Sequence, residues 1–279
     1  MKCHTLTIPG FTIACKIWGD AKNPPILALH GWLDNANSFD GIAEYLQHNF
    51  YFIAIDLPGH GLSSHLPEGC NYHFTDGIFN IIQIIRALEL EKIHLLGHSM
   101  GACLASLLAG VSPECLLSLS LIEGLGPFSS PEETACKQLA QYATVLQKPI
   151  RKSKAYSLMD AAQARSAKGY VSFDIAKTLC ERGLYEAQGI YYWRHDQRLL
   201  TPSPLYMTEG QIQSCLQKIN VKTHLFWASD GFAFDSTLMQ DRINSIKEIQ
   251  ITHLEGGHHI HMEQPEVVGK YLTCFYNGI

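Results

Sequence analysis

Short, nearly uninterrupted apolar runs recur along the chain, and segments with apolar residues at helical spacing separate them. The apolar runs that we predict to be strands cover residues 26–29, 51–55, 93–99, 116–123, 223–228 and 248–254. Helical spacing follows the first three runs, over 38–48, 75–90 and 100–110. Such strands are typical of a parallel sheet that is covered on both faces and built from strand–helix–strand units. The pattern therefore predicts an α/β fold with a mostly parallel central sheet flanked by helices.

Local sequence signals predict one further element and the start of the first helix. Pro9-Gly10 divides residues 5–17 into two short apolar segments, which predicts a β-hairpin at the start of the chain. Ser38 stands directly before the first helical segment, where we expect its side chain to act as an N-cap.

The alternation of strand and helix stops between Gly124 and about Thr208. Helical spacing recurs there in three segments, 132–148, 154–168 and 174–188. This interval is far longer than loop statistics allow for a bare connection. We predict one α/β core formed by residues 1–123 and 209–279, which a mostly helical insertion over 124–208 interrupts.

Composition excludes several classes of protein. The 279 residues carry 21 Lys and Arg against 26 Asp and Glu, a net charge of −5, which argues against binding nucleic acid. We find no signal peptide and no run of about 18 apolar residues that would span a membrane, so we expect a cytoplasmic protein without a membrane partner. The nine cysteines include no C-x-x-C pair, which argues against a disulfide framework and a cysteine zinc site.

The sequence Gly97-His98-Ser99-Met100-Gly101 lies between an apolar run and a helical segment. G-x-S-x-G at a strand-to-helix junction is typical of a nucleophile elbow, in which small residues permit a sharp turn and the serine hydroxyl is exposed. The alternative is a serine that only caps the helix. The position of the motif favours Ser99 as a nucleophile.

A serine hydroxyl needs a base to take its proton. His258 follows the last predicted strand, at the same edge of a parallel sheet as Ser99, so we predict that His258 is this base. His259 and His261 extend the run to H-H-x-H, which could be a metal site, but no matching carboxylate pattern accompanies it. We therefore expect neither a metal nor, in the absence of a nucleotide-binding glycine motif, another cofactor.

Several motifs in order resemble the α/β-hydrolase superfamily, and within it the serine hydrolase-like group, which is similar in pattern to epoxide hydrolases and haloalkane dehalogenases. They are LHGWLDNANSFD (29–40), AIDLPGHGLSS (54–64), LLGHSMGA (95–102), LIEGLGP (121–127), YWRHDQRL (192–199) and GGHHIHMEQPE (256–266). The resemblance implies that the insertion is a cap after the sixth core strand. It also implies an oxyanion hole from the N–H groups of Trp32 and Met100, and structural roles for His30 and His60.

Two departures from that pattern narrow the chemistry. The dehalogenase and epoxide hydrolase branches have Asp where this chain has Ser99, and Leu33 stands where epoxide hydrolases usually have Pro. Acyl-enzyme chemistry is therefore favoured, and we expect an esterase acting on a small-molecule ester with a small or medium acyl group. Thioester hydrolysis, C–C bond hydrolysis, acyl transfer and a non-catalytic ligand-binding role remain alternatives.

The acid that would orient His258 has more than one candidate. In the superfamily it commonly follows the seventh core strand, but this chain has Gly231 at that register and Asp230 one residue early. Some branches place it after the sixth core strand, where Glu123 stands. We favour Glu123 over Asp230, with Asp235 third.

Among the charged residues of the insertion, Arg194 is the candidate for substrate binding. It could contact an anionic substrate group. We favour the structural alternative, an anchor in which Arg194 pairs with Asp196 or with a carboxylate of the core.

Overall fold

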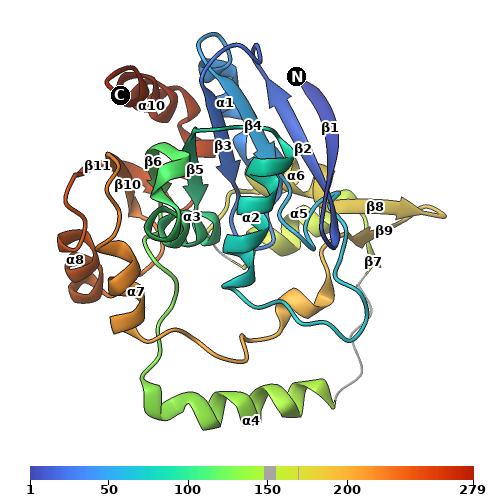
Figure 1. Ribbon diagram of the computed structural model, residues 1–279. Helices are drawn as coiled ribbons and strands as arrows, with labels where there is room; N and C mark the ends of the chain where they lie inside the picture. The colour runs from blue at the N-terminus through green and yellow to red at the C-terminus, as the bar shows by residue number, and fades with distance from the viewer. Residues whose placement is uncertain (148–154, 169) are drawn as a thin grey trace.

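An eight-stranded sheet forms the centre of the computed structural model, which describes residues 1–147, 155–168 and 170–279. Its strand order is β1-β2-β4-β3-β5-β6-β10-β11 (Figure 1). The strands are β1 (Lys2–Ile8), β2 (Phe11–Trp18), β3 (Pro25–Leu29), β4 (Tyr51–Ile55), β5 (Ile93–His98), β6 (Leu116–Ile122), β10 (Thr223–Asp230) and β11 (Ile249–Gly257).

From β4 to β11 all neighbouring strands are parallel, whereas β2 is antiparallel to both β1 and β4. The predicted hairpin is present, because Ile8 pairs with Phe11 across Pro9-Gly10 and Gly10 has φ +84°. All carboxyl ends of the parallel strands meet at one edge, where we expected the chemistry.

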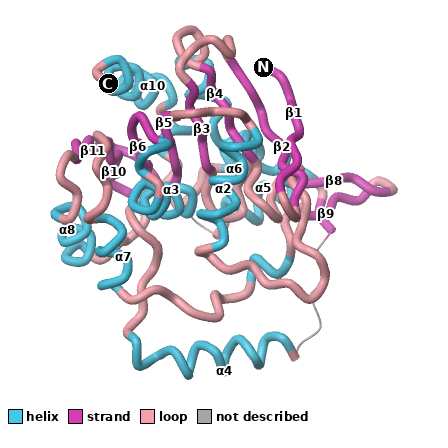
Figure 2. Tube along the Cα trace, viewed as in Figure 1, coloured by secondary structure: helices cyan, strands magenta, loops and turns pink. Residues whose placement is uncertain are grey.

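Two groups of helices cover the two faces of the sheet (Figure 2). One face packs against α1 (Asp40–Leu46), α9 (Ile260–Glu263) and α10 (Pro265–Asn277). The other packs against α2 (Asp76–Ala87), α3 (Met100–Val111), α7 (Glu209–Leu216) and α8 (Ser236–Asn244). Successive residues of a strand point to opposite faces of the sheet. Ile26 and Ala28 of β3 pack on the side of α1 and α10, and Leu27 and Leu29 pack on the side of α2 and α3.

The predicted cap of α1 is wrong. Asn35 caps a short 3-10 helix over Ala36–Phe39, and α1 begins only at Asp40. Ser38 instead places its hydroxyl 2.7 Å from Nε2 of His261, in the buried interior. The side chain thus satisfies a buried ring nitrogen rather than a helix end.

Residues between β6 and α7 form helices and a small sheet of their own. The helices are α4 (Ala135–Leu146), α5 (Leu158–Ser166) and α6 (Phe173–Gly183), and the antiparallel strands are β7 (Ala155–Tyr156), β8 (Leu184–Ala187) and β9 (Ile190–Trp193). Helix α4 has no buried residue and extends away from the rest of the molecule (Figure 1).

The last third of the predicted helix 174–188 is wrong, because β8 occupies it. The helix ends at Gly183, and Gln188 and Gly189 both have positive φ values, 55° and 77°. Two such residues make the turn of a two-residue hairpin, and the stacked rings of Tyr185 and Tyr192 hold the strands in register. Among the described residues, no helix is both long and apolar enough to cross a membrane.

Candidate active site

Ser99 lies in the sharp turn between β5 and α3, with φ 52° and ψ −116°. Two glycines make this turn possible. A Cβ atom on Gly97 would come within 2.5 Å of the Gly101 carbonyl oxygen, and one on Gly101 within 2.1 Å of the Leu29 carbonyl oxygen. The G-x-S-x-G spacing is therefore a steric requirement of the elbow, which places the Ser99 hydroxyl at the N-terminus of α3.

His258 comes directly after β11 and faces Ser99. Its Nε2 atom lies 2.9 Å from Oγ of Ser99, and its Nδ1 atom lies 3.1 Å from Oε2 of Glu123. Because a carboxylate only accepts hydrogen bonds, Nδ1–H donates to Glu123 and Nε2 is left to accept the serine proton. Residues that follow β5, β6 and β11 thus form one hydrogen-bonded chain, although β10 separates β6 from β11 in the sheet.

Glu123 is fully buried and follows β6 with φ 54°. Two backbone amides fix its carboxylate: Ala228 donates to Oε1 at 2.7 Å and Phe232 donates to Oε2 at 3.0 Å. These donors stabilise a charged carboxylate in a buried place. The Oε2 atom therefore reaches His258 in a fixed orientation.

The other two candidate acids lie elsewhere. Asp230 is exposed at the end of β10 and accepts from the hydroxyl of Ser229 at 3.2 Å. Asp235 caps α8 by accepting from the N–H of Leu238 at 2.9 Å. Among the hydrogen bonds of the described residues, neither carboxylate bonds His258.

Gly231 lies against the carboxylate of Glu123. A Cβ atom at this position would lie 2.0 Å from Oε2 of Glu123. The Glu123 carboxylate therefore occupies the space into which a side chain at position 231 would project. A glycine at 231 and a glutamate at 123 are sterically matched.

Aromatic rings surround the imidazole of His258. The ring centroids of Tyr170 and Phe232 each lie 5.9 Å from it. Burial lowers the pKa of His258 below its usual value of 6.5, although the hydrogen bond that its Nδ1–H donates to Glu123 opposes this shift. The imidazole is therefore neutral at pH 7, which is the state that a general base requires.

The two predicted oxyanion donors lie on separate segments near the elbow. Met100 is the first residue of α3, so its N–H has no partner within the helix. Trp32 precedes Leu33, which has φ 60°, and its indole N–H donates to the carbonyl of Leu199 at 3.0 Å. Within the described part of the chain, neither backbone amide donates a recorded hydrogen bond.

His30 and His60 are buried, and their rings pack on each other with centroids 5.0 Å apart. Nε2 of His30 accepts from the N–H of Leu57 at 3.0 Å. These contacts match the structural roles that the sequence resemblance implied.

Arg194 donates from Nε to the carbonyl of Leu184 at 2.8 Å and lies over the ring of Tyr185. Asp196, its predicted partner, instead forms an ion pair with Arg198 at 2.6 Å. The side chain thus contacts β8, and substrate binding by Arg194 stays a prediction that these contacts do not support.

Two arginines that the sequence analysis missed connect α5 and α6 to the core. Arg182 forms a buried ion pair with Asp56, and Arg165 pairs with Asp34 and donates to the carbonyl of Leu33 at 2.9 Å. Asp56 follows directly after an apolar strand, which is the signal that could have identified it. Nothing in the sequence pairs either aspartate with a residue more than 120 positions later.

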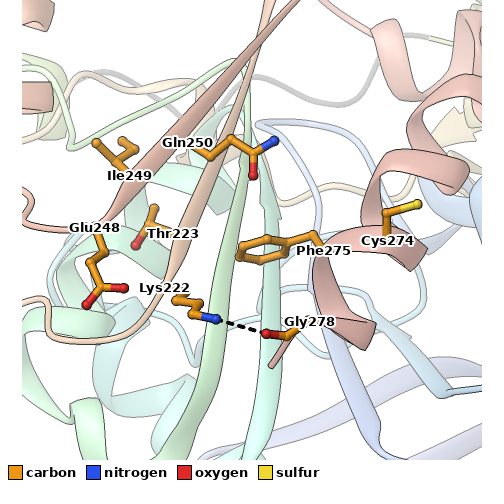
Figure 3. A pocket seen from close by; sticks show the side chains of 8 residues that line it. All are labelled: Lys222, Thr223, Glu248, Ile249, Gln250, Cys274, Phe275 and Gly278. Carbon is orange, nitrogen blue, oxygen red and sulfur yellow. Dashed lines mark hydrogen bonds between the residues drawn. The ribbon is translucent and has the colours of Figure 1, made fainter.

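A pocket of about 400 Å³ lies where β10 and β11 begin, and Figure 3 shows the side chains that line it. Thr223 and Ile249, the first residues of β10 and β11, line it. Lys222 and Gly278 also line it, and Nζ of Lys222 donates to the carbonyl of Gly278 at 2.8 Å. Because parallel strands share one direction, their starts lie away from Ser99. This pocket is not part of the candidate active site.

Comparison with known proteins places this architecture in a family. A model of the alpha/beta hydrolase fold family matches residues 24–265. The chain belongs to this family. Within it, this α/β-hydrolase is 30% identical over 285 residues to a serine hydrolase-like protein of Danio rerio, a match that covers 97% of this chain and 86% of that protein.

Solved structures agree with this assignment. A hypothetical protein of Pseudomonas aeruginosa PAO1 has a TM-score of 0.93 and 32% identity, covering 99% of this chain and 100% of its own. The thioesterase domain from the curacin biosynthetic pathway has a TM-score of 0.86 and 26% identity, and the match covers 98% of this chain and 99% of that domain's chain. The predicted fold class and the serine hydrolase-like group are confirmed, and the chain is a member of a hydrolase family.

Proposed function

We propose that this α/β-hydrolase cleaves carboxylic esters of small or medium acyl groups through an acyl-enzyme on Ser99. One observation carries the proposal: His258 lies within hydrogen-bond distance of Ser99 Oγ on one side and of Glu123 on the other. A nucleophile, a base and an orienting acid in this order are the components of serine-based acyl transfer.

In the first half-reaction, Nε2 of His258 takes the proton of Ser99 as Oγ attacks the ester carbonyl carbon. Glu123 keeps the imidazole in the required tautomer and stabilises its positive charge. The tetrahedral intermediate collapses when the C–O bond to the alcohol breaks and His258 returns the proton to the leaving oxygen. An acyl group on Ser99 and a free alcohol result.

In the second half-reaction, His258 deprotonates a water molecule that attacks the acyl carbon. The bond from that carbon to Oγ of Ser99 then breaks as His258 returns the proton to Oγ, which releases the carboxylic acid and restores the free serine. The N–H groups of Met100 and Trp32 would donate to the oxyanion in both steps. The free first N–H of α3 and the strained backbone beside Trp32 support this assignment. Both are fixed before the reaction begins.

The segment 124–208 would cap this site and limit the acyl group. Tyr170 belongs to that segment, and its ring packs against His258. The ion pair between Arg165 and Asp34 connects the same segment to the core close to the proposed oxyanion loop. Both contacts support a cap that lies over the catalytic residues.

The proposal is tested with p-nitrophenyl esters of increasing acyl length. Ser99→Ala should reduce kcat by at least about 10³-fold on every ester that the wild type cleaves. Ser214→Ala, which changes an exposed serine of α7, serves as the matched control and should retain full activity. Hydrolysis that is equal in the Ser99→Ala protein and the wild type would refute the proposal.

Thioester hydrolysis is the second candidate, because a thioesterase domain shares 26% identity and almost the whole fold with this chain. The same residues would act, with a thiolate as leaving group. Rates measured on an oxygen ester and a thioester of the same acyl group distinguish ester hydrolysis from thioester hydrolysis. A kcat/KM at least about tenfold higher for the oxygen ester, equal to about 1.4 kcal/mol, supports the ester proposal, and the reverse ratio favours the thioester.

A further inference from the structure

A second cluster of chemically capable side chains lies behind His258. One carboxylate oxygen of Asp34 is 3.4 Å from Nδ1 of His98 and 3.1 Å from Nε2 of His259. These three atoms, each of which could bind a metal ion, all lie within 4.8 Å of one another. All three side chains are at most 5% exposed. None of these residues is used in the proposed ester hydrolysis.

The hydrogen bonds of the two imidazoles show which nitrogen of each ring carries the proton and which presents a lone pair to Asp34. His98 donates from Nε2 to the carbonyl of His258 at 2.9 Å, and His259 donates from Nδ1 to the carbonyl of Tyr170 at 2.9 Å. A carbonyl only accepts, so the remaining nitrogen of each neutral ring is an acceptor. Both of these nitrogens and a carboxylate oxygen are thus directed toward one another.

Three acceptor atoms that face one another repel unless protons or a metal ion lie between them. A proton between His259 and Asp34 satisfies one contact but leaves Nδ1 of His98, which is fully buried, without a hydrogen-bond partner. A metal ion satisfies all three atoms together. Imidazoles whose other N–H donates to a backbone carbonyl are typical of metal ligands.

We propose that Asp34, His98 and His259 form a binding site for a transition-metal ion of the Zn²⁺ class. Bonds of 2.0–2.1 Å in tetrahedral geometry put ligand atoms about 3.4 Å apart, close to the two separations from the Asp34 oxygen. Three protein ligands leave a fourth position for water. Arg165 holds the other oxygen of Asp34 and so keeps the free oxygen turned toward the histidines.

The site differs from the H-H-x-H arrangement considered in the sequence. His261 bonds Ser38 and does not belong to the cluster, whereas Asp34 and His98 come from distant parts of the chain. Through the bond from His98 to the His258 carbonyl, a bound ion would stiffen the loop that carries His258. We therefore expect zinc to raise the thermal midpoint of unfolding.

The test is calorimetric titration of the reduced, chelator-treated full chain with ZnCl₂. We expect one high-affinity zinc per chain, and His259→Gln should weaken it by more than about 100-fold, because losing an outer partner alone costs 10- to 100-fold. His253→Gln, at an exposed position of β11, is the matched control and should bind as the wild type does. His258→Gln should also retain the zinc, which separates this site from the catalytic residues.

His98→Gln provides a second ligand variant if His259→Gln does not fold, as judged by circular dichroism. X-ray absorption on the wild-type zinc complex needs no variant and should show nitrogen and oxygen ligands with an imidazole signature. Failure to bind zinc overturns the proposal. So does undiminished binding in the folded ligand variants, or sulfur in the first coordination sphere, which would place the ion on cysteines.

Discussion

Ser99 and Glu123 share a backbone conformation that residues other than glycine seldom adopt, with φ values of 52° and 54°. Hydrogen bonds of the sheet hold both. The N–H of Ser99 donates to the carbonyl of Ile122 at 2.9 Å, and the N–H of Glu123 donates to that of Phe226 at 3.0 Å. The strain at the two positions is thus maintained by the surrounding strands, and it directs both side chains toward His258.

The assignment of the acid can be tested with two isosteric substitutions. Glu123→Gln removes the charge that stabilises the His258 imidazolium and favours the wrong tautomer, so kcat should fall by about 10²- to 10⁴-fold. Asp230→Asn changes an exposed carboxylate and should alter kcat less than about twofold. Ester hydrolysis assays on both purified variants check this, and a large loss in Asp230→Asn alone would reverse the assignment.

The pH dependence of catalysis follows from the lowered pKa of His258. The base form is active, so kcat/KM should be constant near pH 7 and fall as the pH drops through the pKa of His258. We expect the midpoint of this acid limb below pH 6.5, because burial disfavours the imidazolium of the free enzyme. A profile of kcat/KM from pH 4 to 8 measures it, and a midpoint above 6.5 would contradict the burial argument.

At the scale of elements, the strands that the candidate site residues follow were predictable from the sequence. Uninterrupted apolar runs identified β5, β6 and β11, and the glycines around Ser99 identified the elbow. The preference for Glu123 over Asp230 depended on the register at the end of a strand. The contact between Glu123 and Gly231 could not be predicted, because it joins two segments that are far apart in the sequence. The β8–β9 hairpin was missed because its turn, Gln188-Gly189, lacks the usual Asn-Gly signal.

The packing of Gly231 against Glu123 predicts that the acid can be moved between strands. Gly231→Ala puts a methyl group against the carboxylate and should lower kcat at least about tenfold, as loss of an oriented acid does. In Glu123→Gly combined with Gly231→Asp, the new carboxylate enters the vacated space. Steady-state assays should then show higher activity than in Glu123→Gly alone, and equal activities would mean that the two positions do not share that space.

For the whole molecule, buried and half-buried histidines couple folding to pH. Burial lowers the pKa of His94 and His224 in the sheet, and that of His195, to about 4, and that of His60 to about 3. The same groups titrate near 6.5 in an unfolded chain. Between these values the unfolded state binds more protons than the native state does.

The free energy of unfolding should therefore decrease as the pH falls from 6.5 toward 4, by up to about 1.4 kcal/mol per pH unit for each proton that only the unfolded chain binds. Urea denaturation at pH 7, 6 and 5 measures this. The midpoint urea concentration should drop at each step. A midpoint that stays constant or rises toward pH 5 would contradict the neutral, buried state of these histidines.

The networks that span the molecule were the part that the sequence did not reveal. Periodicity predicts which residues are buried, but it carries no information about which polar partner a buried charge meets. The ion pair of Arg182 with Asp56 and the cluster of Asp34 with His98 and His259 each join residues from remote segments. Only the folded arrangement brings these residues together.

In the proposed mechanism, His258 and Glu123 activate Ser99 as a nucleophile. A fluorophosphonate probe followed by peptide mass spectrometry tests it most directly, because the probe labels only activated serines. We predict one adduct per chain, on the peptide that contains Ser99, and labelling at least about 100-fold slower in His258→Gln and in Glu123→Gln. The proposed mechanism would be contradicted by an unlabelled wild-type protein, by an adduct on another serine, or by variants that are labelled as fast as the wild type.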